Sequence, residues 1–171
     1  MEIELTVNGE RITAHVDESQ LKAAMKKPKK KTGYEYRNSG YYYVYINGEV
    51  KYAGGPIAGV GEEEFKCGNM YTDKSVAENN ARADELMRDL RRFAAEHGGF
   101  PSYKTYKYSA YEITYLEMSG ELSITRAFAN HAGIVLFMTK EAAQLAVDIF
   151  HDELIWYFTE YDPMPEGWWD D

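Results

Sequence analysis

Apolar and polar residues alternate at the start of the chain, which predicts a β-hairpin. The alternation runs over residues 2–7 and returns over residues 10–16. Asn8-Gly9 lies between the two runs and suits the positive φ angles of a two-residue type I′ turn. That turn would fix the register, so we expect Leu5 to lie opposite Ile12 and Ile3 to lie opposite Ala14.

A short helix and a basic linker are expected after this hairpin. The segment QLKAAM is rich in helix-forming residues, and Asp17 or Ser19 can cap its start. KKPKKKTG, residues 26–33, combines like charges with a proline and a glycine, as expected of a linker. The sequence therefore predicts a small N-terminal ββα module over residues 1–25, joined by this linker to the rest of the chain.

A second hairpin is predicted at YYYVYINGEVKY, residues 41–52, around another Asn-Gly pair. A two-residue turn at Asn47-Gly48 would place Tyr43 opposite Tyr52 and Tyr45 opposite Val50. One face of the hairpin would then carry Tyr41, Tyr43, Tyr45, Val50 and Tyr52. We interpret this aromatic face as sheet core with tyrosine hydroxyls along a protein-facing rim. The alternative is an open platform on which nucleic-acid bases stack.

The apolar spacing then changes to a helical period. DKSVAENNARADELMRDLRRFAAEHGG predicts a helix of about six turns, with Asp73 as N-cap and Gly98-Gly99 at its end. Alternating residues return over 104–117 and 121–130, and the apolar run GIVLFM at 133–138 predicts a central strand. Thr139 then caps a second long helix, KEAAQLAVDIFHDELIWYFTEY.

A short internal similarity supports the fold class. Residues 69–81 match residues 135–147 at an offset of 66, which aligns Tyr71 with Phe137 and Asp73 with Thr139. We therefore expect an α+β fold in which two long helices pack on one or more antiparallel sheets, built from two ββ(β)α-like units. The main domain would cover residues 34–161, and residues 162–171 would form an acidic tail that contains tryptophan.

Composition and charge narrow the possible functions. The chain has 171 residues and a formal net charge of −9. Residues 141–171 hold nine acidic residues and no Lys or Arg, whereas residues 22–37 hold seven basic residues and one acidic residue. An acidic surface repels nucleic acid and attracts basic protein surfaces. No apolar run is long enough for a membrane helix, and the charged start does not resemble a signal peptide.

Catalytic and metal-binding patterns are missing from the sequence. The four histidines have no metal-ligand spacing, and no serine lies in a nucleophile elbow. The glycine-rich segment GGPIAGVGEEE lacks the lysine of a phosphate loop. Cys67 is the single cysteine, which excludes an internal disulfide framework and fits a reducing cytoplasm. We expect no enzyme activity, cofactor or metal.

Three segments of the sequence are distinctive: GYYYVYINGEVKY, the string N-x-Y-T-D-K-x-V-A-E-N-N-A-R-A-D-x-L-M-R-x-L-R-R-F-A, and LFMTKEAAQLAVDIFHDELIWYF. They resemble a family of small accessory proteins from phages, prophages and conjugative elements of Gram-positive gut bacteria. The resemblance covers residues 33–161, with GGPIAGVGEEE as a departure from it. It implies an accessory gene of mobile DNA, a setting shared with anti-CRISPR inhibitors. No residue role follows from it.

The resulting hypothesis is a non-enzymatic anti-defence protein of a bacterial cytoplasm, most directly an inhibitor of a type II Cas9 complex. Its acidic surface would imitate phosphate, and its aromatic residues would anchor the contact. The predicted partner-binding residues are Asp148, Asp152, Glu153, Glu160, Tyr157, Tyr161, Trp168 and Trp169.

The alternative hypothesis is a nucleic-acid-binding accessory protein of phage replication or transfer. It would use basic residues of the linker and of the first long helix: Lys27, Lys29, Lys30, Lys31, Arg88, Arg91 and Arg92. A third interpretation is a structural or regulatory protein that self-associates through its two long helices.

Overall fold

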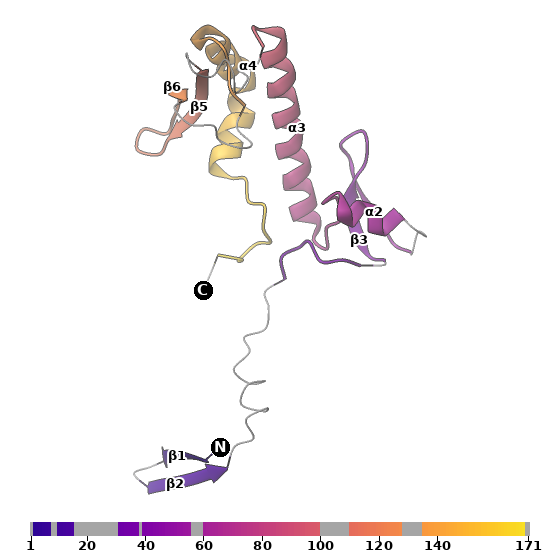
Figure 1. The fold of residues 1–171 in the computed structure, drawn as a ribbon, viewed down its shortest axis with the longest axis vertical. Helices are drawn as coiled ribbons and strands as arrows, with labels where there is room; N and C mark the ends of the chain where they lie inside the picture. Colours follow the sequence, from indigo (N-terminus) through magenta and orange to yellow (C-terminus); the bar gives the residue numbers. More distant parts are fainter. Residues whose placement is uncertain are drawn as a thin grey trace. The chain divides into compact units, whose positions relative to one another are not determined.

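The chain has an α+β fold of paired strands and long helices (Figure 1). The computed structural model describes residues 2–7, 10–15, 31–37, 39–55, 60–99, 110–127 and 135–169. The chain is divided into two compact units, Met1–Lys31 and Thr32–Asp171, and the boundary between them falls within the predicted linker. None of the helices in the described ranges is both long and apolar enough to cross a membrane.

In its described residues the first unit contains an antiparallel hairpin, β1 (Glu2–Val7) with β2 (Glu10–His15). Leu5 lies opposite Ile12 and Ile3 opposite Ala14, so the predicted register is confirmed. The Asn8-Gly9 turn, the predicted helix after it and the linker residues before Lys31 lie outside the described residues.

The second hairpin pairs β3 (Tyr41–Val44) with β4 (Val50–Ala53) in a register that differs from the prediction by one residue. Tyr42 lies opposite Tyr52 and Val44 opposite Val50. The turn contains three residues instead of two: Tyr45 N donates to Glu49 O at 2.8 Å, and Gly48 N donates to Tyr45 O at 2.8 Å. Gly48 has a φ of 86°, which this three-residue loop requires.

The register change redistributes the tyrosines over both faces of the hairpin, so the predicted single aromatic face is wrong. Tyr42, Val44 and Val50 pack with Tyr71 and with the start of α3 (Lys74–Glu96). On the other face Tyr41 is 1% exposed. It lies against Glu64 of α2 (Val60–Lys66) and against Met70, which follows this helix. The hairpin is thus covered on both faces. Tyr45 at its tip and Tyr52 on β4 remain exposed.

Both long helices begin at the predicted caps. The Asp73 carboxylate accepts hydrogen bonds from the backbone N–H groups of Ser75 and Val76 at the start of α3. The Thr139 hydroxyl accepts one from Ala142 at the start of α4 (Lys140–Thr159). A side chain at this position satisfies N–H groups that a helix start otherwise leaves unpaired. α4 carries a kink at Phe150, whose φ and ψ are −105° and 21°.

The third hairpin joins β5 (Ala110–Leu116) to β6 (Glu121–Ala127). The predicted central strand at 133–138 is wrong over its described part: only Phe137 pairs, in an isolated bridge with Tyr111. Tyr42 and Tyr71 form the same kind of bridge. In both places the chain reaches a helix cap two residues later, which leaves room for a single pair. These shared contacts agree with the internal similarity, while its interpretation as two related units stays a prediction.

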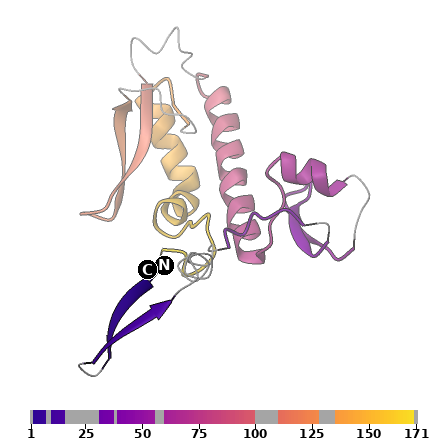
Figure 2. The ribbon, with the colours of Figure 1, turned by 60° about the horizontal axis from the view of Figure 1, so that its bottom comes forward.

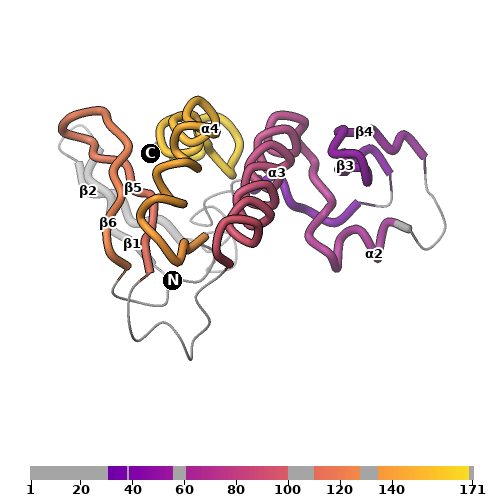
Figure 3. The backbone as a smooth tube through the Cα atoms, turned by 90° about the horizontal axis from the view of Figure 1, so that it is seen from above, coloured from indigo at the N-terminus to yellow at the C-terminus, as the bar shows by residue number. Residues whose placement is uncertain are grey.

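The main core lies where α3, α4 and the β5–β6 hairpin meet (Figures 2 and 3). α4 packs against both strands of that hairpin and also against α3. The C-terminal half of α3 contributes Leu86, Leu90, Phe93 and Ala94, whereas its start packs on the β3–β4 hairpin through Val76 and Ala77. α3 therefore carries two separate apolar clusters, one toward each end.

Candidate protein-binding surface

One face of α4 combines acidic residues with exposed apolar side chains. Glu141, Leu145, Asp148 and Ile149 are spaced so that they share this face of the helix before its kink, and Asp152 follows directly after the kink. Leu145 is 42% exposed, Ile149 is 56% exposed, and the side chain of Asp152 is fully exposed. We call these five residues the acidic face of α4. Carboxylates around an apolar centre suit a protein partner with a basic surface.

Glu153, a predicted contact residue, is instead part of an internal ion pair between the two long helices. Its carboxylate accepts from Arg82 Nε at 2.8 Å and from the other guanidinium nitrogen Nη2 at 3.0 Å. The Arg82 guanidinium also lies 3.9 Å from the centroid of the buried Trp156 ring. The hydrogen bond to Glu153 raises the pKa of Arg82. A bidentate pair stacked on an aromatic ring positions α4 on α3.

The tail after α4 is held against α3 by a chain of hydrogen bonds. The Tyr161 hydroxyl donates to Asn80 Oδ1 at 3.0 Å, and Asn80 Nδ2 donates to the Tyr34 hydroxyl at 2.8 Å. Tyr34 in turn donates to the carbonyl of Pro163 at 2.8 Å, and Asn79 Nδ2 donates to the carbonyl of Asp162 at 3.1 Å. Burial raises the pKa of Tyr161 to about 12. Tyr161 is therefore a structural contact.

The remaining predicted aromatic residues differ in exposure. Tyr157 is half-buried and stacks on Tyr161 with ring centroids 5.2 Å apart. Trp168 is also half-buried. Trp169 is 71% exposed, and its indole N–H donates to Asp162 Oδ1 at 3.3 Å. Glu160 at the end of α4 and Trp169 in the tail are therefore an exposed acidic and an exposed aromatic side chain.

The residues of the nucleic-acid hypothesis are only partly described. Lys27, Lys29 and Lys30 lie outside the described residues, and Lys31 is exposed. Arg88, Arg91 and Arg92 are exposed on α3, where Arg92 pairs with Asp89 at 3.3 Å. Asp84 and Glu85 lie one turn before these arginines, and Asp89 lies between Arg88 and Arg91. This face of α3 is thus of mixed charge, unlike a continuous basic stripe.

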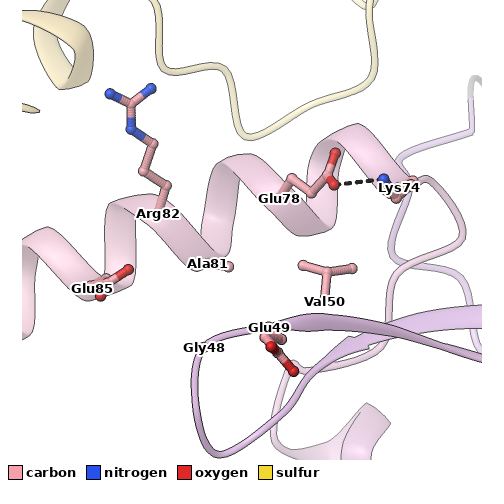
Figure 4. Close-up of a pocket in the computed structure, with 8 residues that line it drawn as sticks. All are labelled: Gly48, Glu49, Val50, Lys74, Glu78, Ala81, Arg82 and Glu85. Atoms are coloured by element: carbon pink, nitrogen blue, oxygen red, sulfur yellow. Dashed lines mark ion pairs between the residues drawn. The ribbon is translucent and has the colours of Figure 1, made fainter.

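Crevices on both sides of the β3–β4 turn separate its tip from α3. One, of about 430 Å³, lies on the β4 side, with Glu78, Arg82 and Glu85 among its lining residues (Figure 4). Another, of about 650 Å³, lies on the β3 side near Arg88 and Asn69. No group of histidine, cysteine or acidic residues suited to a metal ion occurs among the described residues.

Comparisons with protein-family models, with curated proteins and with solved structures found no match. The resemblance to mobile-element proteins therefore rests on the segments quoted above. The residues that sequence reasoning missed are Arg82, Trp156 and the pair Asn79-Asn80. Two adjacent asparagines inside a long helix are a signal that could have been used, because asparagine favours helix ends over helix interiors.

Proposed function

We propose that this protein is a non-enzymatic anti-defence protein of a mobile genetic element that binds a basic, nucleic-acid-binding surface of a host complex. A type II Cas9–guide complex in the bacterial cytoplasm is the first partner to test. The acidic face of α4 carries the proposal: it places Asp148 and Asp152 around exposed Leu145 and Ile149. The sequence has no Lys or Arg from residue 141 to its end.

The two parts of this face support binding in different ways. Carboxylates facing a lysine- and arginine-lined groove increase the association rate and make it sensitive to salt. Leu145 and Ile149 supply apolar area that a partner can remove from water, which slows dissociation. The partner-binding residues that fit this role are the exposed Asp148, Asp152, Glu160 and Trp169, whereas Glu153 and Tyr161 join α4 and the tail to α3.

Charge reversal of Asp148→Lys with Asp152→Lys tests the proposal. Both side chains are exposed, and neither is part of an ion pair with Arg or Lys in the described residues. The control is Glu117→Lys with Glu121→Lys, an equal change of charge at exposed positions flanking the β5–β6 turn. We expect the α4 variant to bind a Cas9–guide complex at least about tenfold more weakly in biolayer interferometry, chiefly through slower association.

Two results would contradict the proposal. If the two variants bind with equal affinity, then the acidic face of α4 is not the contact surface. If the wild-type protein neither binds the Cas9–guide complex nor inhibits DNA cleavage by it, then the partner is not of this type. A third variant, Leu145→Ala with Ile149→Ala, removes the apolar part of this face. We expect it mainly to increase the dissociation rate.

The nucleic-acid alternative keeps one supporting observation. Arg88 and Arg91 are exposed on α3, and neither has an ion-pair partner in the part of the chain that the structure describes. Fluorescence anisotropy with labelled single-stranded DNA and RNA tests this alternative directly. It requires salt-dependent binding by the isolated protein that weakens in Arg88→Ala with Arg91→Ala.

A further inference from the structure

The β3–β4 and β5–β6 hairpins each form a crevice with a long helix, α3 and α4 respectively. The β4–α3 crevice is lined on the helix side by Lys74, Glu78, Ala81, Arg82 and Glu85, and on the hairpin side by Gly48 and Glu49 of the turn and Val50 of β4. The β6–α4 crevice is lined by Lys140, Gln144 and Val147, and by Leu122, Ser123 and Ile124. Lys74, Glu78 and Ala81 correspond at the offset of 66 to the three helix residues of the second crevice, whereas Arg82 and Glu85 have no counterpart in its lining. The same arrangement of edge strand and helix thus occurs twice.

β4 presents unpaired backbone groups on its side away from β3, beginning at Val50, which lines the first of these crevices. Tyr42 exchanges backbone hydrogen bonds with Tyr71, so its N–H and C=O point away from β4. In an antiparallel pair, the residue opposite such a position also points its backbone groups away from its partner strand. The N–H and C=O groups of Tyr52, and of Val50 two residues earlier, therefore face outward. Neither residue has a hydrogen-bond partner for them within the described ranges.

The opposite edge of the same hairpin is already closed. Beyond the bridge to Tyr71, the side-chain amide of Asn69 accepts from Val44 N at 2.8 Å and donates to Val44 O at 2.9 Å. This amide occupies the place that a further strand would take. Among the described residues, the β4 side of the hairpin is the one that remains open to another strand.

The charges in the β4–α3 crevice favour a cationic ligand. Lys74 pairs with Glu78 at 2.7 Å, and Arg82 extends away from the hairpin toward Glu153 (Figure 4). Glu85 has no ion-pair partner in the described residues, and the nearest cation to Glu49 is Lys51 at 3.8 Å. Arg88 lines the neighbouring crevice on the other side of the hairpin tip, which shares Gly48 and Glu85 with this one. The β6–α4 crevice, by contrast, has Lys140 as its charged lining residue.

We infer that β4 and its crevice form a docking site for an extended segment of a partner protein with Lys or Arg at alternating positions. The segment would hydrogen-bond to Val50 and Tyr52 and extend the β3–β4 sheet by one strand. Side chains of a strand alternate between its two faces, so every second residue would point toward α3 and reach Glu78 and Glu85. This site is separate from the acidic face of α4 and does not depend on its function.

A nine-residue peptide of alternating threonine and lysine is a direct probe of the full-length protein in NMR titrations. We expect it to protect the amide protons of Val50 and Tyr52 from hydrogen exchange. Glu78→Gln with Glu85→Gln should weaken this binding about tenfold, whereas Asp148→Asn with Asp152→Asn removes the same charge elsewhere and should change it far less. Glutamine at 78 reproduces the residue found at the equivalent position of the β6–α4 crevice.

Several outcomes would overturn the inference. No binding at millimolar peptide would exclude the site. Shifts confined to the acidic face of α4, without protection of the Val50 and Tyr52 amides, would indicate charge attraction alone. Equal binding of a threonine–glutamate peptide, or protection of Ile124 in place of Val50, would contradict the proposed charge selectivity or location.

Discussion

At the scale of single residues, Glu35 joins two segments that are distant in the sequence. Its carboxylate accepts a hydrogen bond from the Thr72 hydroxyl at 2.6 Å, and others from the backbone N–H and hydroxyl of Thr32 at 2.6 and 3.1 Å. Together these hydrogen bonds, the one from Thr72 foremost, lower the pKa of Glu35 from 4.5 to about 2. An anion that accepts several hydrogen bonds stabilises the folded state as long as it stays ionised.

Glu35→Gln is expected to lower the free energy of unfolding by about 1–2 kcal/mol at pH 7, because the charge-assisted hydrogen bonds are weakened. A carboxyl group with a lowered pKa contributes its full stability above the pKa of the unfolded chain and loses it as pH falls through the folded value. The difference between wild type and variant should therefore shrink between pH 4.5 and pH 2. Urea unfolding at several pH values measures it, and a difference independent of pH would contradict this role.

At the scale of elements, the two long helices differ in the chemistry of their N-caps. Asp73 accepts from two backbone N–H groups and from the Ser75 hydroxyl, and its pKa is lowered, mainly by that hydroxyl. Thr139 accepts from one backbone N–H at 3.1 Å and does not titrate in the acid range. A charged cap also interacts favourably with the helix dipole.

Asp73→Ala and Thr139→Ala should each lower the free energy of unfolding by about 1 kcal/mol at neutral pH. Because its folded pKa is lowered, Asp73 loses its stabilising effect as pH falls below its ordinary value of 3.8. The effect of Asp73→Ala should therefore decrease in acid while that of Thr139→Ala stays constant. Urea unfolding of both variants at several pH values measures these losses of stability. The same pH dependence for both variants would show that the charge of the Asp73 cap does not contribute.

Elements defined by local signals were predicted well from the sequence. The caps at Asp73 and Thr139 and the register around Leu5 depend on neighbouring residues only, and the structure confirms them. The register of YYYVYINGEVKY was wrong because Asn-Gly suits a three-residue loop as well as a two-residue loop. Because the loop contains one residue more than predicted, Tyr52 lies opposite Tyr42 instead of Tyr43. The Tyr52 side chain therefore belongs to the other face of the hairpin.

The candidate surface was less predictable than the helices that carry it. The acidic residues of α4 follow from composition and spacing alone. The internal roles of Glu153 and Tyr161 depend on Arg82 and Asn80, which lie 71 and 81 residues away in the sequence. No local pattern encodes such a contact, so the roles of these two predicted contact residues could be assigned only from the fold.

At the scale of the whole main unit, α3 connects two apolar clusters of unequal size. The cluster of Tyr71, Val76 and Ala77 holds three buried residues, whereas the cluster with α4 and the β5–β6 hairpin holds twelve. Buried apolar area is the main source of folding stability, so the two ends of α3 should differ in local stability. The two isolated bridges, Tyr42 with Tyr71 and Tyr111 with Phe137, provide matched amide protons for comparing these ends.

Native-state hydrogen exchange should show lower opening free energies for the amides of Tyr42 and Tyr71 than for those of Tyr111 and Phe137. Val76→Ala removes buried apolar volume from the small cluster at a cost of about 1–3 kcal/mol. We expect it to accelerate exchange at Tyr42 and Tyr71 by about tenfold or more and to leave Phe137 unchanged. An equal response of all four amides would instead mean that the described part of this unit opens as one cooperative body. The β4 edge proposed as a docking site would then share the stability of the main core.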